Sequence, residues 1–141
     1  MKIAIVTPYS DEPASWVARA CTSVLEQTVP VTHVLVSDGP RRTDLTGVAN
    51  SVSVHLELPT PASDSGATPR VIGGRWAVEN GYDIVCYLDA DDALDRVDRG
   101  LEGFGVAFLD HNGPAEASDG KCRADHSFAV GCVVLDPRRR R

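Results

Sequence analysis

The sequence predicts a three-layer α/β/α sandwich on a Rossmann-like, mostly parallel sheet. Short apolar runs rich in β-branched residues alternate along the chain with stretches of helical periodicity. Turn sequences containing glycine, proline or asparagine separate these runs. At 141 residues, 43% of them hydrophobic and 24% charged, the chain has the size and composition of one soluble globular domain.

The first strand is expected over residues 2–6 and is followed by a helix. Ser10 or Asp11 can cap this helix, which has Pro13 in its first turn. Apolar side chains recur along it at helical spacing, so they form one stripe that packs on the sheet. The stripe consists of Trp16, Val17, Ala20, Cys21, Val24 and Leu25.

Three further strands are expected over residues 34–36, 52–58 and 84–88. A loop rich in proline, serine and glycine follows the third strand, and Thr68-Pro69 opens a second long helix. That helix ends at Asn80-Gly81, a typical C-terminal signal. The alternation of strand and helix is what predicts parallel strands joined by right-handed crossovers.

Beyond residue 92 the helical spacing continues to Phe104, and a short strand is expected over residues 106–109. Residues 111–121 are polar and glycine-rich, which predicts a loop, and 128–135 is the last apolar run. We therefore divide the chain into three parts by sequence. They are the first half of a domain, 1–95, the start of its second half, 96–137, and a basic tail, 138–141.

The formal net charge is −6, and without the four arginines at 138–141 it would be −10 (−6 − 4). An acidic body argues against binding to nucleic acid, which requires clustered lysine and arginine. No apolar run approaches the ~18 residues of a membrane span. The first apolar run is too short for a signal peptide. The four cysteines are scattered, which predicts reduced core cysteines and a cytoplasmic protein.

The most informative segment is the acidic turn that follows the strand at 84–88. Asp89, Asp91 and Asp92 lie within four residues, and carboxylates so close repel one another. Ligands of open α/β sheets bind just past the carboxyl ends of the strands. Carboxylate oxygens suit a hard divalent cation such as Mg²⁺ or Mn²⁺, which could in turn hold a diphosphate. The alternative is that Asp91 or Asp92 only caps a following helix.

Four segments in this order resemble the amino-terminal half of a family 2, GT-A-type glycosyltransferase. They are residues 3–9, 23–28, 36–39 and 81–92, so the resemblance covers residues 1 to about 95. Such enzymes move a sugar from a nucleotide donor to an acceptor hydroxyl, usually with inversion and with a divalent metal. The resemblance implies a metal-dependent hexosyltransferase, with Mn²⁺ or Mg²⁺ as cofactor and UDP-sugar as the commonest donor.

The resemblance also implies a nucleotide-binding set drawn from three strand ends. Thr7, Pro8 and Tyr9 would line the nucleotide base, and Asp38 would accept a hydrogen bond from the base or ribose. Asp38 could otherwise be a simple turn residue before Gly39-Pro40. Asp89 would contact both nucleotide and metal, and Asp91 would hold the metal on the diphosphate.

The family has an arginine near the nucleotide, on the helix before the acidic motif. Arg70 and Arg75 both qualify, and we slightly favour Arg75. The general base of the family lies beyond the strand that 128–135 resembles. We therefore assign no catalytic residue. Asp110, Glu116, Asp119 and Asp125 are acids outside the matching motif.

Of two rival functions, only the second stays open at this point. A nicotinamide-binding Rossmann domain would carry G-x-G-x-x-G after the first strand, where Thr7-Pro8-Tyr9 stands instead. A nucleotide-binding fragment or pseudoenzyme would have the donor half and lack transfer activity. The four histidines share no metal-ligand spacing. With the acceptor side missing, we expect the chain to bind donor, transfer slowly and expose an apolar edge that favours self-association.

Overall fold

The structure is a computed structural model that describes residues 1–49, 52–94 and 131–134. The helix continuing past residue 94, the strand at 106–109, the loop at 111–121 and the basic tail at 138–141 lie outside the described residues. The described elements are β1 (Ile3–Tyr9), α1 (Ala14–Leu25), β2 (Val31–Ser37), the 3₁₀ helix η1 (Thr43–Leu45), α2 (Thr46–Ala49), β3 (Val54–Glu57), α3 (Ala67–Glu79), β4 (Ile84–Tyr87) and β5 (Gly131–Val134).

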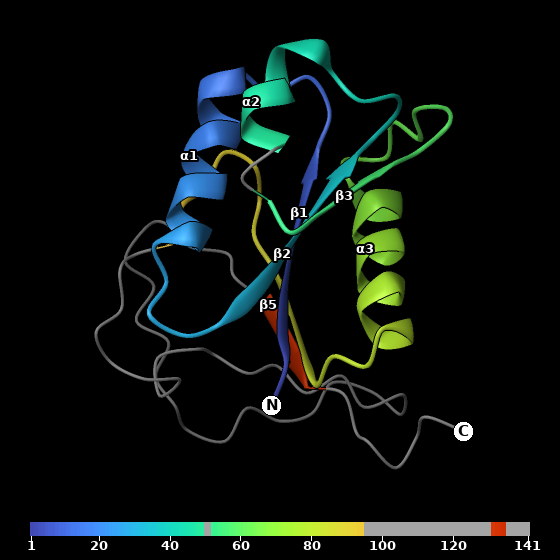
Figure 1. Cartoon of the computed structure of the whole chain (residues 1–141). Helices are drawn as coiled ribbons and strands as arrows, with labels where there is room; N and C mark the ends of the chain where they lie inside the picture. The colour runs from blue at the N-terminus through green and yellow to red at the C-terminus, as the bar shows by residue number, and fades with distance from the viewer. Residues whose placement is uncertain (50–51, 95–130, 135–141) are drawn as a thin grey trace.

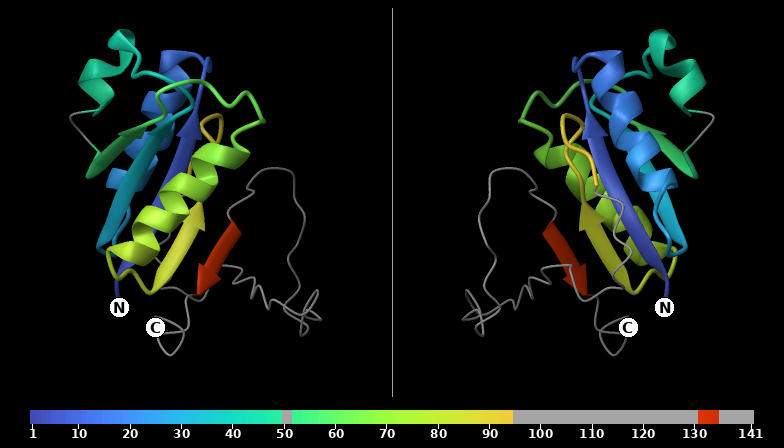
Figure 2. Two further views of the ribbon diagram at one scale, coloured as in Figure 1. Left: turned by 90° about the vertical axis from the view of Figure 1, so that its right-hand side faces the viewer. Right: turned by 90° about the vertical axis from the view of Figure 1, so that its left-hand side faces the viewer.

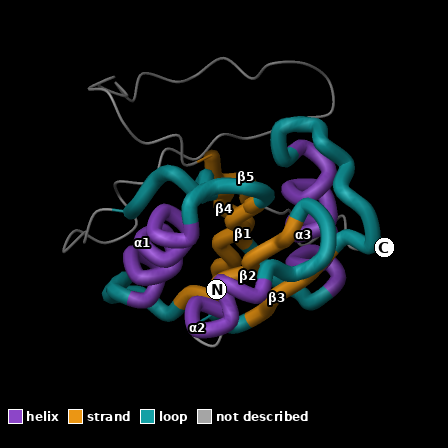
Figure 3. Tube along the Cα trace, turned by 90° about the horizontal axis from the view of Figure 1, so that it is seen from above, coloured by secondary structure: helices purple, strands orange, loops and turns teal. Residues whose placement is uncertain are grey.

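The strands form one sheet (Figure 1), in the order β3-β2-β1-β4-β5 (Figure 3). β1 pairs in parallel with both β2 and β4, and β2 pairs in parallel with β3. β5 lies within the apolar run expected at 128–135 and pairs antiparallel with β4. The predicted mostly parallel α/β sheet is therefore confirmed. Chain order reverses between β1 and β4, because β2 and β3 lie on one side of β1 and β4 on the other.

Helices cover both faces of the sheet, α1 on one and α3 on the other (Figures 2 and 3). Side chains of β1 alternate between the two resulting cores, as the period of a strand requires. Ile3 and Ile5 pack with Ala20 of α1. Ala4 and Val6 pack in the core that contains Ala77 of α3. This alternation decides which β1 side chains can reach a site at the end of the sheet.

Helix α3 approaches the sheet closely, since its buried face is made of small residues. A Cβ atom added at Gly73 would overlap Val6 Cγ1 and lie 3.0 Å from Val36 Cγ2. One added at Gly74 would overlap the Tyr87 hydroxyl. Glycine at both positions lets the helix axis lie near the strands, and this fixes which residues of α3 reach the sheet end.

The structure corrects the start of α1 and part of its packing. Pro13 is the N-cap itself, and neither Ser10 nor Asp11 caps the helix. Trp16 and Leu25, expected in the core, are 44% and 57% exposed. The buried part of the apolar stripe is therefore narrower than the sequence indicates and consists of Val17, Ala20, Cys21 and Val24.

Other differences lie at strand ends and in one connection. β1 continues through Pro8 to Tyr9 rather than ending at residue 6, and β2 begins at Val31. β3 is shorter than the expected 52–58, whereas α3 ends before Asn80-Gly81 as predicted. The short helices η1 and α2 were not expected, because polar residues and Gly47 break their apolar period.

The cysteines only partly follow the prediction of reduced core residues. Cys21 is free and buried, and burial raises its thiol pKa to about 11. Cys86 of β4 is disulfide-bonded, which corrects the expectation for this residue. The cytoplasmic location stays a prediction. Among the described helices, none has the length and hydropathy of a membrane span.

Candidate functional site

A cavity of about 520 Å³ opens at the carboxyl ends of β1, β2 and β4. It lies where the chain order reverses, the position at which open α/β sheets bind ligands. The cavity is lined by Pro8, Tyr9, Ser10, Asp11, Glu12, Asp38, Ser63, Ser65, Gly66, Arg70, Asp89, Ala90 and Asp91. The structure thus brings Asp38 and the acidic turn to one cavity, as the order of strands predicted.

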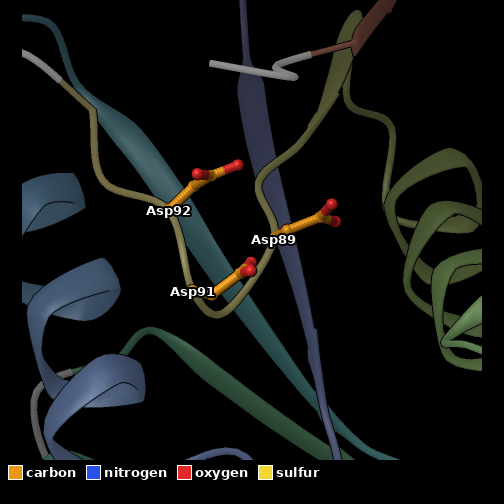
Figure 4. A group of neighbouring side chains, drawn as sticks. All are labelled: Asp89, Asp91 and Asp92. Atoms are coloured by element: carbon orange, nitrogen blue, oxygen red, sulfur yellow. The ribbon is translucent and has the colours of Figure 1, made fainter. Parts of the chain in front are cut away.

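The acidic turn after β4 gathers three carboxylates, Asp89, Asp91 and Asp92. One carboxylate oxygen from each lies within 4.8 Å of the others, and Figure 4 shows the side chains arising from a single turn. The Asp92 amide donates to the Asp89 carbonyl (3.1 Å), which closes the turn. Burial and the neighbouring charges of Asp91 and Asp89 raise the pKa of Asp92. An all-oxygen, negatively charged set of this kind fits Mg²⁺ or Mn²⁺.

Arg70 of α3 forms an ion pair with Asp89 across the cavity. Its Nη1 also donates to the Ser65 carbonyl (2.9 Å), so the guanidinium is held between the α3 entry loop and the acidic turn. Arg75, which the sequence favoured, is elsewhere. Its side chain is 75% exposed and pairs with Glu79 one turn along the helix (2.7 Å). The structure therefore brings Arg70, and not Arg75, to the site.

Asp38 follows β2 and is nearly buried. Its two carboxylate oxygens accept hydrogen bonds from the backbone amides of Ala62 (2.6 Å) and Ser63 (3.1 Å). The loop that they hold contains Ser63 and Ser65 at φ +54° and +58°, a region that non-glycine residues rarely occupy. Asp38 thus shapes the cavity wall in addition to lining the cavity.

The three residues at the end of β1 divide between cavity and core. Pro8 and Tyr9 line the cavity, as predicted. Thr7 does not, because its fully buried hydroxyl bonds to His33 Nε2 (2.9 Å) on the α1 side of the sheet. The Tyr9 hydroxyl lies 2.8 Å from His55 Nε2, which anchors the ring against β3.

Sequence reasoning did not single out the loop after β1, where Ser10, Asp11 and Glu12 line the cavity. Arg42 holds this loop by donating from Nη1 to the carbonyls of Ser10 (3.2 Å) and Glu12 (2.5 Å). The Nη2 atom of Arg42 forms an ion pair with a carboxylate oxygen of Asp44 (2.6 Å). The position of the loop directly after the first strand was the available signal, because that is where such sheets place ligand contacts.

The charge of the cavity lining is strongly negative. Five of the lining residues carry carboxylates, and Arg70 supplies the single cation among them. A phosphorylated ligand would be repelled by such a lining, and a bound divalent cation would offset that repulsion. The chemistry of the site therefore favours a cation together with an anionic ligand, rather than an anion alone.

No protein-family model matches the sequence, and no curated protein matches it either. Solved structures do share the fold. TarS of S. aureus in complex with UDP has a TM-score of 0.53 at 22% identity, over 66% of this chain and 28% of that one. The mannosyltransferase PcManGT from Pyrobaculum calidifontis, in complex with GDP-Man and Mn²⁺, has a TM-score of 0.50 at 16% identity, over 67% and 28%.

These likenesses establish the fold class: two-thirds of the chain has the α/β fold of part of the GT-A glycosyltransferases. At 22% identity or less the likeness shows the fold alone. The chain spans 28% of the TarS 1–349 structure with UDP, 17% of a second TarS structure and 28% of PcManGT. Activity and substrates of the chain are consequently matters of proposal.

Proposed function

We propose that this chain is the donor-binding portion of a metal-dependent glycosyltransferase that moves a sugar, with inversion, from a nucleotide-sugar to an acceptor hydroxyl. The observation that carries the proposal is the three-carboxylate turn at the reversal point of the sheet, beside a cavity of about 520 Å³. The shared fold with glycosyltransferases supports it. We further propose a UDP-sugar as donor, because two of the similar TarS structures hold UDP and UDP-GlcNAc.

In this proposal Asp91 and Asp92 hold the cation, and Asp89 divides its oxygens between the cation and Arg70. Mn²⁺ or Mg²⁺ would neutralise the charge on the departing nucleoside diphosphate as a Lewis acid. Arg70 would add its guanidinium to the same phosphates, since bidentate pairing with phosphate is its favoured geometry.

The nucleotide base would lie against Pro8 and Tyr9, with Asp38 at the ribose or base. Two amide contacts already engage Asp38, but each carboxylate oxygen has a second lone pair to offer. Thr7 would not contact the ligand and would act only by fixing the end of β1 from within the core. Arg75 would take no part in binding.

A second candidate, donor binding without transfer, is favoured by one observation. A transferase needs a general base near the acceptor hydroxyl. Among the described residues, the acids that line the cavity all belong to the acidic turn, to Asp38 or to the Asp11–Glu12 loop, and no further acid is present there. Release of UDP from a UDP-sugar, with and without acceptor sugars, separates the two functions.

The decisive measurement is the affinity for UDP by calorimetry, with Mn²⁺ or with chelator. We expect binding to require the metal, and Asp91→Asn to remove most of that requirement. Asp83→Asn is the matched control, because Asp83 precedes β4 and lies at the opposite end of that strand. Equal affinity for UDP with metal and with chelator would refute the proposal.

A further inference from the structure

Helix α1 contacts the acidic turn at two points. Arg19 donates from Nη2 to the backbone carbonyl of Asp91. One turn further along the helix, the Ser23 hydroxyl accepts a hydrogen bond from the Leu94 amide (3.0 Å). The turn is thus attached to α1 through its main chain, on either side of Asp92.

Ser23 is well suited to this contact. Its side chain is 8% exposed, and its hydroxyl proton is directed to the Ala20 carbonyl (2.7 Å). The lone pairs of the oxygen are then left to accept the Leu94 amide. Residues four apart lie on the same face of a helix, so Arg19 and Ser23 present a donor and an acceptor along one line.

Arg19 also acts on the turn through its charge. Its guanidinium is a positive charge hydrogen-bonded to the main chain of the turn that carries the three carboxylates. The side chain therefore has two effects on a cation held by the turn. Its hydrogen bond fixes the carbonyl of Asp91, which favours binding, and its positive charge disfavours binding.

We propose that Arg19 and Ser23 are positioning residues that hold Asp91 and Asp92 in the geometry that binds the divalent cation. This inference rests on the proposed function, which assigns the cation to the turn. Outer contacts that orient metal ligands affect metal affinity by roughly 10–100-fold. Arg19 and Ser23 contact the main chain of the turn and not a carboxylate, so we expect effects at the lower end of this range.

Ser23→Ala gives the clearest test because it changes no charge. In titrations of Mn²⁺ alone, followed by the loss of the free-ion electron paramagnetic resonance signal, we expect this variant to bind Mn²⁺ about tenfold more weakly. Ser23→Thr keeps the hydroxyl and should restore most of the affinity. Arg19→Gln should weaken binding less, since the loss of a positive charge partly offsets the loss of the hydrogen bond.

Three control variants separate positioning from general destabilisation. Ser15→Ala makes the same chemical change at an exposed position of α1, and Arg75→Gln removes an exposed arginine far from the turn. Val34→Ala weakens the opposite core without touching α1. All three should keep the affinity for Mn²⁺ within about twofold, a spread that corresponds to less than half a kcal/mol.

Hydrogen exchange of the Leu94 amide provides a readout that needs no metal. We expect exchange at this amide to be faster in Ser23→Ala and unchanged in Ser15→Ala. If the unaltered chain binds Mn²⁺ and Ser23→Ala binds it equally well, the positioning role is wrong and the proposed function stands. If the unaltered chain binds no Mn²⁺, the proposed function fails and the positioning role fails with it, whatever the exchange shows of the turn.

Discussion

His33 makes the stability of this protein sensitive to mild acid. Its ring is 2% exposed, with Nε2 bonded to the Thr7 hydroxyl and Nδ1 without a hydrogen-bond partner among the described residues. Burial lowers the pKa of His33 from 6.5 to about 4, because the imidazolium would lose its hydration in the core. The folded protein therefore keeps this histidine neutral where the unfolded chain would protonate it.

The sign follows from proton linkage. Between pH 6.5 and pH 4 the unfolded state binds more protons at this residue than the folded state, so stability falls as the pH falls through this window. The difference between a pKa of 6.5 and one of about 4 corresponds to about 3 kcal/mol of stability once both states are protonated. Most of this, about 2 kcal/mol, would already be lost between roughly pH 7 and pH 4.5.

Urea unfolding at intervals across this range, followed by tryptophan fluorescence, measures the effect. His33→Gln keeps a polar group beside Thr7 and does not titrate. We expect it to be less stable than the unaltered chain at neutral pH, and to lose about 2 kcal/mol less on acidification. The carboxylates contribute equally to both chains, so they cancel in the difference. Parallel curves for the two chains would refute a neutral, desolvated His33.

Four further outcomes are expected from the structure. Gly73→Ala should destabilise the protein by about 1–3 kcal/mol in thermal unfolding, because the new methyl group overlaps Val6 and crowds Val36. Arg70→Gln should weaken UDP binding by roughly tenfold or more while leaving the melting temperature nearly unchanged, since its ion pair is partly exposed. Asp38→Asn should loosen the loop it holds, seen as faster amide exchange at that loop, and slow exchange there would contradict the role. Removal of metal by chelator should abolish nucleotide binding without unfolding the chain.

The order of elements was predictable because it rests on local periodicity. The sequence also indicated that Asp38 and Asp91 would meet, since each follows a parallel strand and such strands end at one edge. The shape of the cavity wall was not predictable in the same way. It depends on the loop that Asp38 fixes, whose backbone includes two serines in the left-handed region.

The choice between Arg70 and Arg75 required the rotation of α3 about its axis, which its sequence barely signals because both of its faces carry apolar residues. The glycines at 73 and 74 were the available signal, as they mark the face that contacts the sheet. Trp16 was misplaced for a similar reason. Hydrophobic spacing shows a stripe but not how much of it the sheet covers.

The proline within β1 has a consequence for the seam between β1 and β4. The last ladder bond there runs from the Leu88 amide to the Val6 carbonyl (3.0 Å), after which β4 turns away. The next main-chain groups of β1 directed toward this seam belong to Pro8, since Tyr9 turns its carbonyl the other way to accept from Asp38 (2.7 Å). Any residue other than proline would place an amide N–H there with no strand to accept its hydrogen bond. Proline has none, so β1 and β4 can separate at this point without leaving an amide hydrogen unpaired.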